Sequence, residues 1–218
     1  MRILIAGAGR LGGQAAHLLS ATGHHVTTVD ANRDALDRLR GEPAQHRICG
    51  DACEPDVLER AGAYNADLVI AATGEDEDNL VISLLAKRHF AVPRVLARVN
   101  DPDDTWLFDQ RWGVDVALPA EGPLVALIDE ATGATDTIGL LRLAAAGVTL
   151  VESRIRIGSA AAGRTLADIA LPQGTVVAAV IRDGQPTVPG PGHRIESGDI
   201  LLLVTSSATE HDIEAALR

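Results

Sequence analysis

The sequence predicts an α/β protein, in which a doubly wound parallel sheet is followed by a small α+β domain at the carboxyl end. Three observations carry this prediction. Short apolar runs alternate with segments of helical spacing over roughly the first 130 residues, which is typical of strands buried between two layers of helices. A glycine-rich turn joins the first run to the first helical segment. Beyond a Gly/Thr-rich break at residues 132–135 the alternation stops.

The opening of the chain carries the strongest signal. Residues 2–7 are expected to form a buried strand, residues 13–22 a helix and residues 26–29 a second strand. Between the first two stands Gly7-Ala8-Gly9-Arg10-Leu11-Gly12, a G-x-G-x-x-G motif. Gly7 permits the tight turn, Gly9 lets a phosphate approach the backbone, and Gly12 lets the helix lie close to the sheet. The helix N-terminus then offers free N–H groups to a phosphate.

Asp30 ends the second strand, 18 residues after Gly12. A carboxylate at this place can accept hydrogen bonds from both ribose hydroxyls of an adenosine, and it repels the 2′-phosphate of NADP. A bare motif is a weak indication, because glycine-rich turns are common. Here strand, glycines, helix, second strand and acid follow in order. The sequence therefore predicts a Rossmann-like nucleotide-binding site rather than a structural turn that resembles one.

The following segments continue the alternation. Helices are expected at residues 32–39, 56–61 and 76–89, and strands at residues 47–49, 67–72, 94–99 and 114–118. In parallel sheets of this kind, ligands bind beyond the carboxyl ends of the strands. The residues expected at this rim are Gly7 to Gly12, Asp30, Asp51, Ala52, Ala72, Thr73, Gly74 and Arg98.

Residues 75–78 are four consecutive acids at the start of the helix expected at 76–89. Carboxylates in a first helical turn interact favourably with the helix dipole, and Thr73 is placed where it can act as a cap. This structural interpretation is preferred to a metal site.

Residues 101–112 are expected to form a helix that carries Trp106, Phe108 and Trp112, three of the chain's five aromatic residues. Aromatic residues are enriched at the centres of interfaces. We therefore expect this helix to pack on another subunit, with ordinary core packing as the alternative.

The remaining chain is expected to hold a helix at 121–130, strands at 148–157, 175–182 and 200–205, a short helix at 164–170 and a closing helix at 209–217. Domains are therefore expected at residues 1–134 and 138–218. The second domain has nearly uncharged central strands and is thin for a self-sufficient unit. Pairing with a second copy would complete its core.

Composition argues against several classes of function. The formal net charge of −11 argues against nucleic acid as a partner and against electrostatic docking on anionic lipid. No apolar run approaches the ~20 residues of a membrane-spanning helix, and no secretory leader is apparent, so a cytosolic location is expected. Cys49 and Cys53 lack further ligands, which favours reduced thiols over a zinc site.

Groups for catalysis are missing from the sequence. A dehydrogenase of this fold needs a proton donor or acceptor beside the nicotinamide. None of the seven histidines follows a strand end with a carboxylate to orient it, and no nucleophile-elbow or Walker-type motif occurs. A nucleotide site without such groups indicates a sensor whose ligand shifts a conformational equilibrium. A small NAD-dependent oxidoreductase is the alternative from another class.

The motifs resemble a known family. The first part of the chain resembles the RCK (KTN) domain of bacterial TrkA- and KtrA-type potassium-uptake subunits. The residues that carry this resemblance are Gly7–Gly12, Asp30, Gly50-Asp51-Ala52, Ala71-Ala72-Thr73-Gly74 with Asn79-Leu80, and Ala97-Arg98-Val99. The last eighty residues resemble the carboxy-terminal RCK domain through Gly163-Arg164-Thr165-Leu166 and Gly198-Asp199-Ile200-Leu201. The likeness covers nearly the whole chain.

The resemblance implies a non-enzymatic homodimer that assembles into a higher oligomer, such as an octameric ring. This assembly would be cytoplasmic, peripheral to the inner face of the membrane, and would gate a membrane potassium-translocating subunit of the TrkH or KtrB type. A regulator of another cation channel or antiporter stays open as an alternative. The implied ligands are NAD(H), ATP or ADP.

By position, the resemblance assigns each rim residue a part of the ligand. Gly7, Gly9, Arg10 and Leu11 would meet the phosphates, with Arg10 reaching the terminal one. Asp30 would meet the ribose and Asp51 with Ala52 the adenine. Thr73, Gly74 and Arg98 would lie near the distal half.

Two further assignments follow from the resemblance alone. Glu121 stands where some members place an acid that helps bind a cation between subunits, although that acid normally follows a proline directly and here Ala120 intervenes. Some relatives bind cyclic di-AMP between paired carboxy-terminal domains. Arg182 and Ile181 are candidate contacts by position, and a hydrophobic dimer seam without ligand is the alternative.

Overall fold

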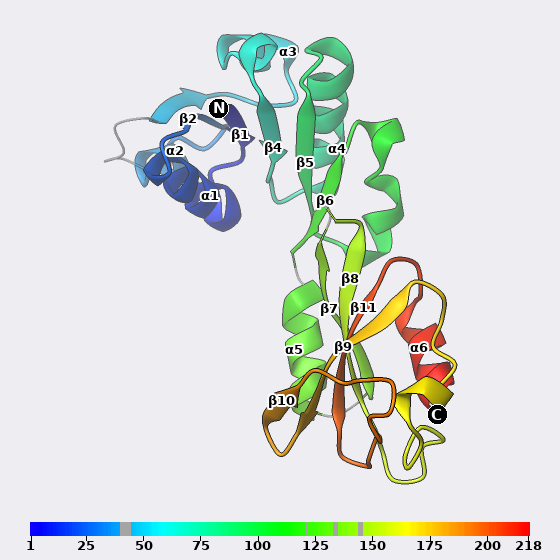
Figure 1. Ribbon diagram of the computed structural model, residues 1–218. Helices are drawn as coiled ribbons and strands as arrows, with labels where there is room; N and C mark the ends of the chain where they lie inside the picture. Colours follow the sequence, from blue (N-terminus) through cyan, green and yellow to red (C-terminus); the bar gives the residue numbers. More distant parts are fainter. Residues whose placement is uncertain (40–44, 121, 133–134, 144–145) are drawn as a thin grey trace. The chain divides into compact units, whose positions relative to one another are not determined.

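The computed structural model of this chain describes residues 1–39, 45–120, 122–132, 135–143 and 146–218. It divides into two compact units, Met1–Glu121 and Gly122–Arg218 (Figure 1). The first holds a parallel sheet with helices and the second an antiparallel sheet with helices, so the predicted fold class is confirmed. The sequence-based domain boundary, between residues 134 and 138, stays a prediction.

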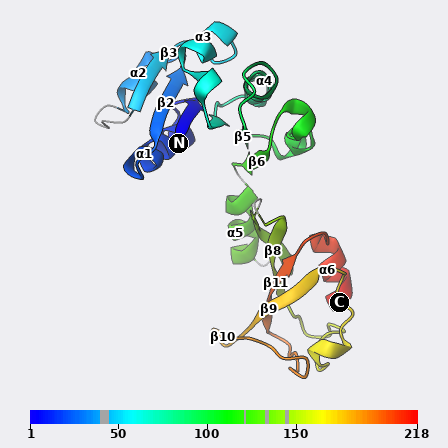
Figure 2. The same ribbon diagram turned by 45° about the horizontal axis from the view of Figure 1, so that its top comes forward.

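The first unit is built on a six-stranded parallel sheet in the order β3-β2-β1-β4-β5-β6. Its strands are β1 (Arg2–Ala6), β2 (His25–Asp30), β3 (Gln45–Cys49), β4 (Leu68–Ala71), β5 (Arg94–Val99) and β6 (Val116–Pro119). Figure 2 shows β2 and β3 on one side of the sheet and β5 and β6 on the other. The chain order thus reverses between β1 and β4, which is the point where open α/β sheets bind ligands.

Helices cover both faces of this sheet. They are α1 (Arg10–Ala21), α2 (Arg33–Asp37), α3 (Pro55–Arg60) and α4 (Asp76–Leu84), with a π-helical turn η2 (Leu85–His89) and the 3₁₀ turns η1 (Ala63–Asn65), η3 (Pro102–Leu107) and η4 (Gln110–Trp112). Successive residues of a strand face opposite sides. Ile3 and Ile5 pack with Ala16 of α1, whereas Leu4 and Ala6 belong to the cluster under α3 and α4.

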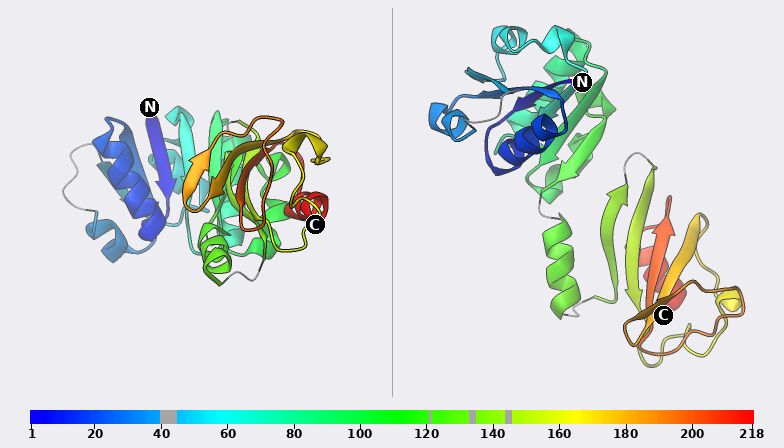
Figure 3. Two further views of the ribbon diagram at one scale, coloured as in Figure 1. Left: turned by 60° about the horizontal axis from the view of Figure 1, so that its bottom comes forward. Right: turned by 60° about the vertical axis from the view of Figure 1, so that its left-hand side comes forward.

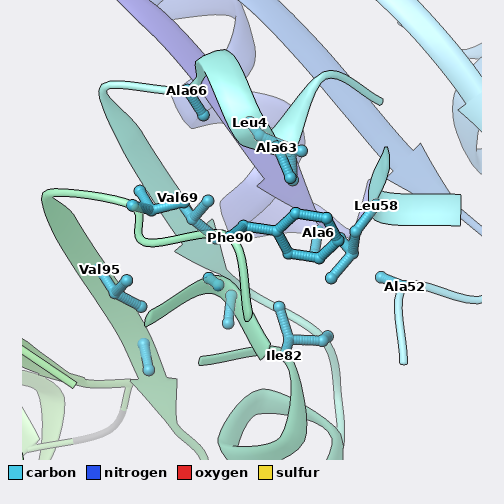
Figure 4. Packing of buried hydrophobic residues seen from close by; sticks show 14 of the residues in the cluster. Leu4, Ala6, Ala52, Leu58, Ala63, Ala66, Val69, Ile82, Phe90 and Val95 are labelled. Atoms are coloured by element: carbon cyan, nitrogen blue, oxygen red, sulfur yellow. The ribbon is translucent and has the colours of Figure 1, made fainter. Parts of the chain in front are cut away.

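The larger of these clusters is filled mainly by aliphatic side chains and holds two aromatic rings, those of Phe90 and Phe108. Figure 4 shows the ring of Phe90 reaching toward Ala6 and Leu58, with Ile82 close by. Leu58 and Ile82 are fully buried, and each such side chain contributes roughly 1.5–3 kcal/mol by leaving water. The small side chains around this ring leave room for Phe90, which directly follows η2.

The turn from β1 into α1 has no room for side chains at two of its glycines. Gly7 has a φ of +104°, and a Cβ there would lie 2.5 Å from the carbonyl oxygen of Ala72. A Cβ on Gly12 would overlap the carbonyl oxygen of Gly7. Gly13 is different, because the nearest atom to its Cβ would be Cδ2 of Leu39 at 3.1 Å, and the backbone oxygen of Ala8 would lie at an ordinary contact distance of 3.7 Å.

Two segments differ from the predicted helices. Residues 101–112 form the short turns η3 and η4, because the carboxylates of Asp101 and Asp109 accept hydrogen bonds from backbone N–H groups two residues ahead. Residues 164–170 hold only the 3₁₀ turn η5 (Leu166–Asp168). There the N–H groups of Leu166 and Ala167 donate to the carbonyls of His193 and Pro191 rather than within a helix.

The second unit contains a five-stranded antiparallel sheet in the order β10-β9-β11-β8-β7. Its elements are α5 (Gly122–Thr132), β7 (Thr137–Leu143), β8 (Val148–Arg154), β9 (Thr175–Arg182), β10 (Gln185–Thr187), β11 (Ile200–Thr205) and α6 (Glu210–Leu217). Figures 1 and 3 show α5 and α6 on opposite sides of this sheet. The sequence analysis missed β7 and β10, and β7 carries a register irregularity between Gly139 and Leu141.

One ion pair ties the end of β9 to the residue that precedes the neighbouring strand β11. The guanidinium of Arg182 donates from Nε and Nη2 to the two carboxylate oxygens of Asp199, at 2.7 and 2.8 Å. It also bonds Glu196 at 2.7 Å. The Asp199 side chain is only 1% exposed, and its hydrogen bonds with Arg182 hold the pKa of this carboxyl below its usual value.

We expect Gly12→Ala to destabilise the protein by about 2–4 kcal/mol, because the new methyl group overlaps backbone that cannot rotate away. Gly13→Ala is the matched control on the same helix. It gains helix propensity, and its one tight contact is with a flexible side-chain end, so its stability is expected within about 1 kcal/mol of the wild type. Urea unfolding followed by circular dichroism measures both, and equal midpoints for the two variants would contradict the packing argument.

The Arg182–Asp199 pair predicts that the free energy of unfolding decreases at acidic pH. Because the folded pKa of Asp199 is lowered, its stabilisation is present above the unfolded value near ~3.9 and is lost as the pH falls through the folded pKa. Asp199→Asn should therefore cost about 2–4 kcal/mol at neutral pH and much less near pH ~2. Thermal melts of both proteins across this range measure the difference, and a gap that does not narrow in acid would refute the assignment.

Candidate functional site

A cavity of about 330 Å³ lies at the carboxyl ends of the parallel strands. Five consecutive positions of the sheet contribute to it, from β3 through β5. The lining residues are Gly7, Gly9, Val29, Asp30, Ala31, Gly50, Asp51, Ala52, Cys53, Ala72, Thr73, Gly74, Asp78, Ile82 and Arg98. The cavity thus spans both sides of the turn that follows β1.

The turn after β1 presents bare backbone to this cavity. Gly9 is the N-cap residue of α1, and no side chain hydrogen-bonds to this cap. The first turn of α1 contains no acidic residue. A Cβ on Gly9 would meet no atom within 4 Å, so the space above this glycine is open to a ligand. A helix N-terminus of this kind attracts a phosphate through its free N–H groups and its dipole.

Asp30 stands at the end of β2 beside this turn. Its Oδ2 atom accepts a hydrogen bond from the backbone N–H of Ala8 at 2.6 Å, and its Oδ1 atom accepts one from Asn32 at 2.7 Å. These two bonds fix the carboxylate against the glycine turn. Each oxygen retains a further lone pair, so Asp30 can still accept two hydroxyl groups of a ligand.

The side of the cavity formed by β2 and β3 is acidic. Asp51 accepts a hydrogen bond from the N–H of Cys53 through Oδ1 at 2.8 Å, and the backbone oxygen of Asp78 on α4 accepts one from the Cys53 thiol at 3.9 Å. Burial, together with the neighbouring Asp78 and Asp51, raises the pKa of the Cys53 thiol to about 12. Cys53 therefore stays a neutral thiol at physiological pH and is a poor nucleophile.

The side formed by β4 and β5 holds the one guanidinium group of the described lining. Thr73 and Gly74 follow β4, and Arg98 lies near the end of β5. The Nε atom of Arg98 is buried and has no hydrogen-bond partner among the described residues. A buried donor without a partner costs free energy, so a ligand oxygen placed here would be held by a charge-assisted hydrogen bond.

A buried polar network, which the sequence analysis did not identify, supports this side. Asn79 is fully buried in α4 and bonds both Thr73 and the carbonyl oxygen of Arg98. Asp76 accepts hydrogen bonds from the N–H groups of Asn100 and Asp101 at 2.7 and 2.8 Å. Asn79 is a polar residue at an inward-facing position of a helix with apolar neighbours. This pattern is the sequence signal that could have identified it.

Three acids of the run 75–78 lie in the first turn of α4 as expected, namely Asp76, Glu77 and Asp78, whereas Thr73 is not the helix cap. Asp76 is 94% buried and binds the chain after β5 instead of facing solvent at the helix terminus. The N-cap residue of α4 is Glu75, without a side-chain cap. Thr73 instead accepts a hydrogen bond from the N–H of Glu75 at 3.3 Å and donates within the same turn.

The predicted site residues fall into three groups. Nine line the cavity: Gly7, Gly9, Asp30, Asp51, Ala52, Ala72, Thr73, Gly74 and Arg98. Four lie beside it, since Ala8 bonds Asp30, Arg10 is exposed at the start of α1, Leu11 packs against the apolar cluster under α1 and Gly12 packs on Gly7. Glu121 lies outside the described residues.

Several cavity residues were not predicted. They are Val29, Ala31, Gly50, Cys53, Asp78 and Ile82. Most are direct sequence neighbours of predicted residues, and only Asp78 and Ile82 come from a helix. Within the described ranges, no three His, Cys, Asp or Glu residues are placed to hold a metal ion. In the same ranges, no helix has the length and apolar character needed to cross a membrane.

Comparison with known proteins agrees with this architecture. The TrkA-N domain family matches residues 3–119 and the TrkA-C domain family residues 150–218. The Trk system potassium uptake protein TrkA of Mycobacterium tuberculosis is 38% identical over 217 residues, which cover 100% of this chain and 98% of that protein.

Two solved structures share the fold. The GsuK channel bound to NAD aligns with a TM-score of 0.57 and 20% identity over 99% of this chain, which spans only 39% of the channel chain. The Shewanella denitrificans Kef carboxy-terminal domain in its AMP-bound form aligns with a TM-score of 0.52 and 26% identity, over 67% of this chain and 86% of that one. The two domain matches and the full-length relative place this chain in the TrkA family of potassium uptake proteins.

Proposed function

We propose that this protein is the regulatory subunit of a potassium uptake system, and that it binds an adenine nucleotide in the cavity at the rim of the parallel sheet. The observation that carries this proposal is the arrangement around the β1 turn. An open glycine backbone at a helix N-terminus lies between a carboxylate, Asp30, and a guanidinium, Arg98. The helix N-terminus can bind a phosphate, Asp30 can accept hydrogen bonds from a ribose, and Arg98 can bind a further oxygen of the same ligand.

NAD(H), ATP and ADP all satisfy this arrangement. The family assignments of adenine to Asp51 and Ala52 and of the distal half to Thr73, Gly74 and Arg98 agree with the order of the strands. Arg10, exposed at the first turn of α1, is available for a terminal phosphate. NADP is disfavoured, because its 2′-phosphate would meet the carboxylate of Asp30.

We propose that the ligand acts as an effector and is not turned over. Among the described lining residues there is no histidine, lysine or tyrosine to move a proton. Cys53 is held as a neutral thiol by burial and by its acidic neighbours, with its pKa raised to about 12. A small NAD-dependent oxidoreductase, the competing function, would need such a group at this place.

The partner in this proposal is an integral membrane potassium-translocating subunit of the TrkH or KtrB type, bound at the cytoplasmic face of the membrane. Support comes from the full-length relative, which is named as a potassium uptake protein. Neighbours in structure include a channel and a Kef domain, so regulation of another cation channel or antiporter is the second candidate.

We also propose self-association as a dimer that builds a larger ring. Helix α5 carries four apolar side chains that are each more than half exposed: Leu124, Val125, Leu127 and Ile128. Their spacing puts them on one side of the helix. Of the aromatic residues expected at an interface, Trp106 is 70% exposed and Trp112 is 37% exposed, whereas Phe108 is buried core.

Of the ligands that the family resemblance implies, cyclic di-AMP at Arg182 has the least support from the contacts of its proposed binding residue. The guanidinium of Arg182 already bonds Asp199, Glu196 and the carbonyl of Arg194. Four of its five N–H groups are therefore engaged. A phosphate would have to displace these bonds, which favours the alternative of an apolar seam without ligand. The intersubunit cation at Glu121 stays a prediction.

Gly9→Ala tests the nucleotide site with little change to the fold. A Cβ at Gly9 meets no protein atom within 4 Å, so stability should change by less than about 1 kcal/mol. The methyl group fills the space where a phosphate approaches, and affinity for NAD or ADP should fall at least about tenfold. Asp30→Ala should cost about 1.5–3 kcal/mol of binding. Calorimetry measures both, and unchanged affinity would count against the site.

Gly9→Ala also tests whether nucleotide binding affects ion transport. In cells that express this chain with its membrane partner and no other regulator, Gly9→Ala should lower rubidium uptake, whereas the neighbouring control Gly13→Ala should not. Equal rubidium uptake by the wild type and both variants would show that nucleotide binding at this site does not control transport. Steady oxidation of NADH with any carbonyl substrate would instead favour the oxidoreductase.

Ile128→Glu tests the proposed self-association. Ile128 is 63% exposed, so the charge should leave the folded subunit intact but oppose burial of α5 against a second copy. Leu18→Glu is the matched control, since Leu18 is also 63% exposed but lies on α1. Light scattering should show a smaller assembly for Ile128→Glu only. A wild-type monomer, or equal masses for all three proteins, would contradict the proposal.

A further inference from the structure

The order of the strands divides the cavity into two halves of different chemistry. The turn after β1 lies between β2 and β4. On the β2 and β3 side are the carboxylates of Asp30 and Asp51. On the β4 and β5 side are Thr73, Gly74 and the guanidinium of Arg98. A ligand whose phosphates rest on the turn can therefore extend one group into each half.

Asn79 bridges the two strand ends of the β4 and β5 half, and Asp76 and Asn100 add further hydrogen bonds around it. Oδ1 of Asn79 accepts hydrogen bonds from the backbone N–H and the hydroxyl of Thr73, both at 2.9 Å. Nδ2 of Asn79 donates to the carbonyl oxygen of Arg98 at 3.0 Å. Asn79 thus bridges the ends of two neighbouring strands from beneath the cavity, without lining it.

No residue of similar shape can replace this amide. The Thr73 N–H can only donate and the Arg98 carbonyl can only accept, so one side chain must offer an acceptor and a donor side by side. Aspartate lacks the donor and leucine lacks both. Asn79 is fully buried, and water cannot take over either bond cheaply.

We propose that Asn79 is the positioning residue of the β4 and β5 half, and that it sets how tightly the protein holds the part of a ligand beyond the adenosine phosphate. This inference rests on the nucleotide-binding function proposed above. The adenosine half depends on Asp30, whose carboxylate is fixed by Ala8 and Asn32 and does not bond Asn79. The two halves are therefore separable by mutation.

The test uses two probes, AMP for the adenosine half and NAD for both halves, and the variant Asn79→Asp. The new carboxylate keeps the acceptor for Thr73 but turns an oxygen toward the Arg98 carbonyl. We expect affinity for NAD to fall at least about tenfold and affinity for AMP to fall less than about threefold. A merely structural role would lower both affinities by the same factor.

Ser83→Ala is the matched control for damage to the helix. Ser83 is buried on α4 and donates to the backbone oxygen of Asn79 at 2.6 Å, so its loss destabilises the same helix while leaving the Asn79 amide in place. We expect a lower thermal midpoint with an unchanged ratio of NAD to AMP affinity. A ratio that shifts as much in Ser83→Ala as in Asn79→Asp would overturn the proposal.

A second measurement needs no variant and covers the case in which Asn79→Asp does not fold. Hydrogen exchange of the wild type should be slowed across residues 73–79 by NAD but not by AMP. Equal slowing by both ligands would overturn the positioning role alone, as would AMP binding as tightly as NAD. A wild type that binds neither ligand would overturn the proposed nucleotide site, and this inference with it.

Discussion

The close approach of three backbone segments at the end of β1 is the constraint on which the rest of the first unit depends. Gly12 of α1 lies on the carbonyl of Gly7, and Gly7 in turn lies against Ala72 at the end of β4. No side chain fits at either contact. Because the segments touch backbone to backbone, the first turn of α1 is held at the rim of the sheet, with its free N–H groups at the edge of the cavity.

Polar side chains then fix the edges of that rim. Asp30 binds the glycine turn from the β2 side. Asn79 and Asp76 tie the ends of β4 and β5 to the first turns of α4. The bonds of Asp30 to Ala8, of Asn79 to Arg98 and of Asp76 to Asn100 join residues 19 to 24 apart in sequence. Two of the three side chains, Asn79 and Asp76, are buried. Buried polar groups of this kind specify one geometry, since leaving a partner unsatisfied is costly. These hydrogen bonds therefore fix the geometry of the cavity rim.

The second unit is stabilised by different means. Its sheet is antiparallel, and a buried carboxylate, Asp199, is compensated by Arg182 across neighbouring strands. Removing Arg182 would leave the buried carboxylate of Asp199 without its counter-charge, whereas Arg182 would keep Glu196 if Asp199 were removed. At the same time, α5 exposes a continuous apolar side. A unit with so little charge on one helix face is suited to contact another protein surface, which is the physical basis of the assembly proposed here.

The course of the chain in the first unit was largely predictable from sequence. Doubly buried strands appear as continuous apolar runs, and the glycines mark a turn whose steric needs are local. The later differences have equally specific causes. Asp109 is extended and accepts a hydrogen bond from the N–H of Arg111, so it starts a new turn and interrupts the helix expected at 101–112. Strand β7 follows a break that resembled a linker, and its irregular register weakens the alternating pattern.

The sequence by itself determined which segments are buried and where a phosphate can approach the backbone, because both follow from side-chain size and polarity over a few neighbouring residues. Only the tertiary structure decided that Asn79 joins β4 to β5 and that Asp76 binds the chain after β5. Those partners lie 19 to 25 residues apart. Their meeting depends on the order and register of the strands, which no local pattern of residues encodes.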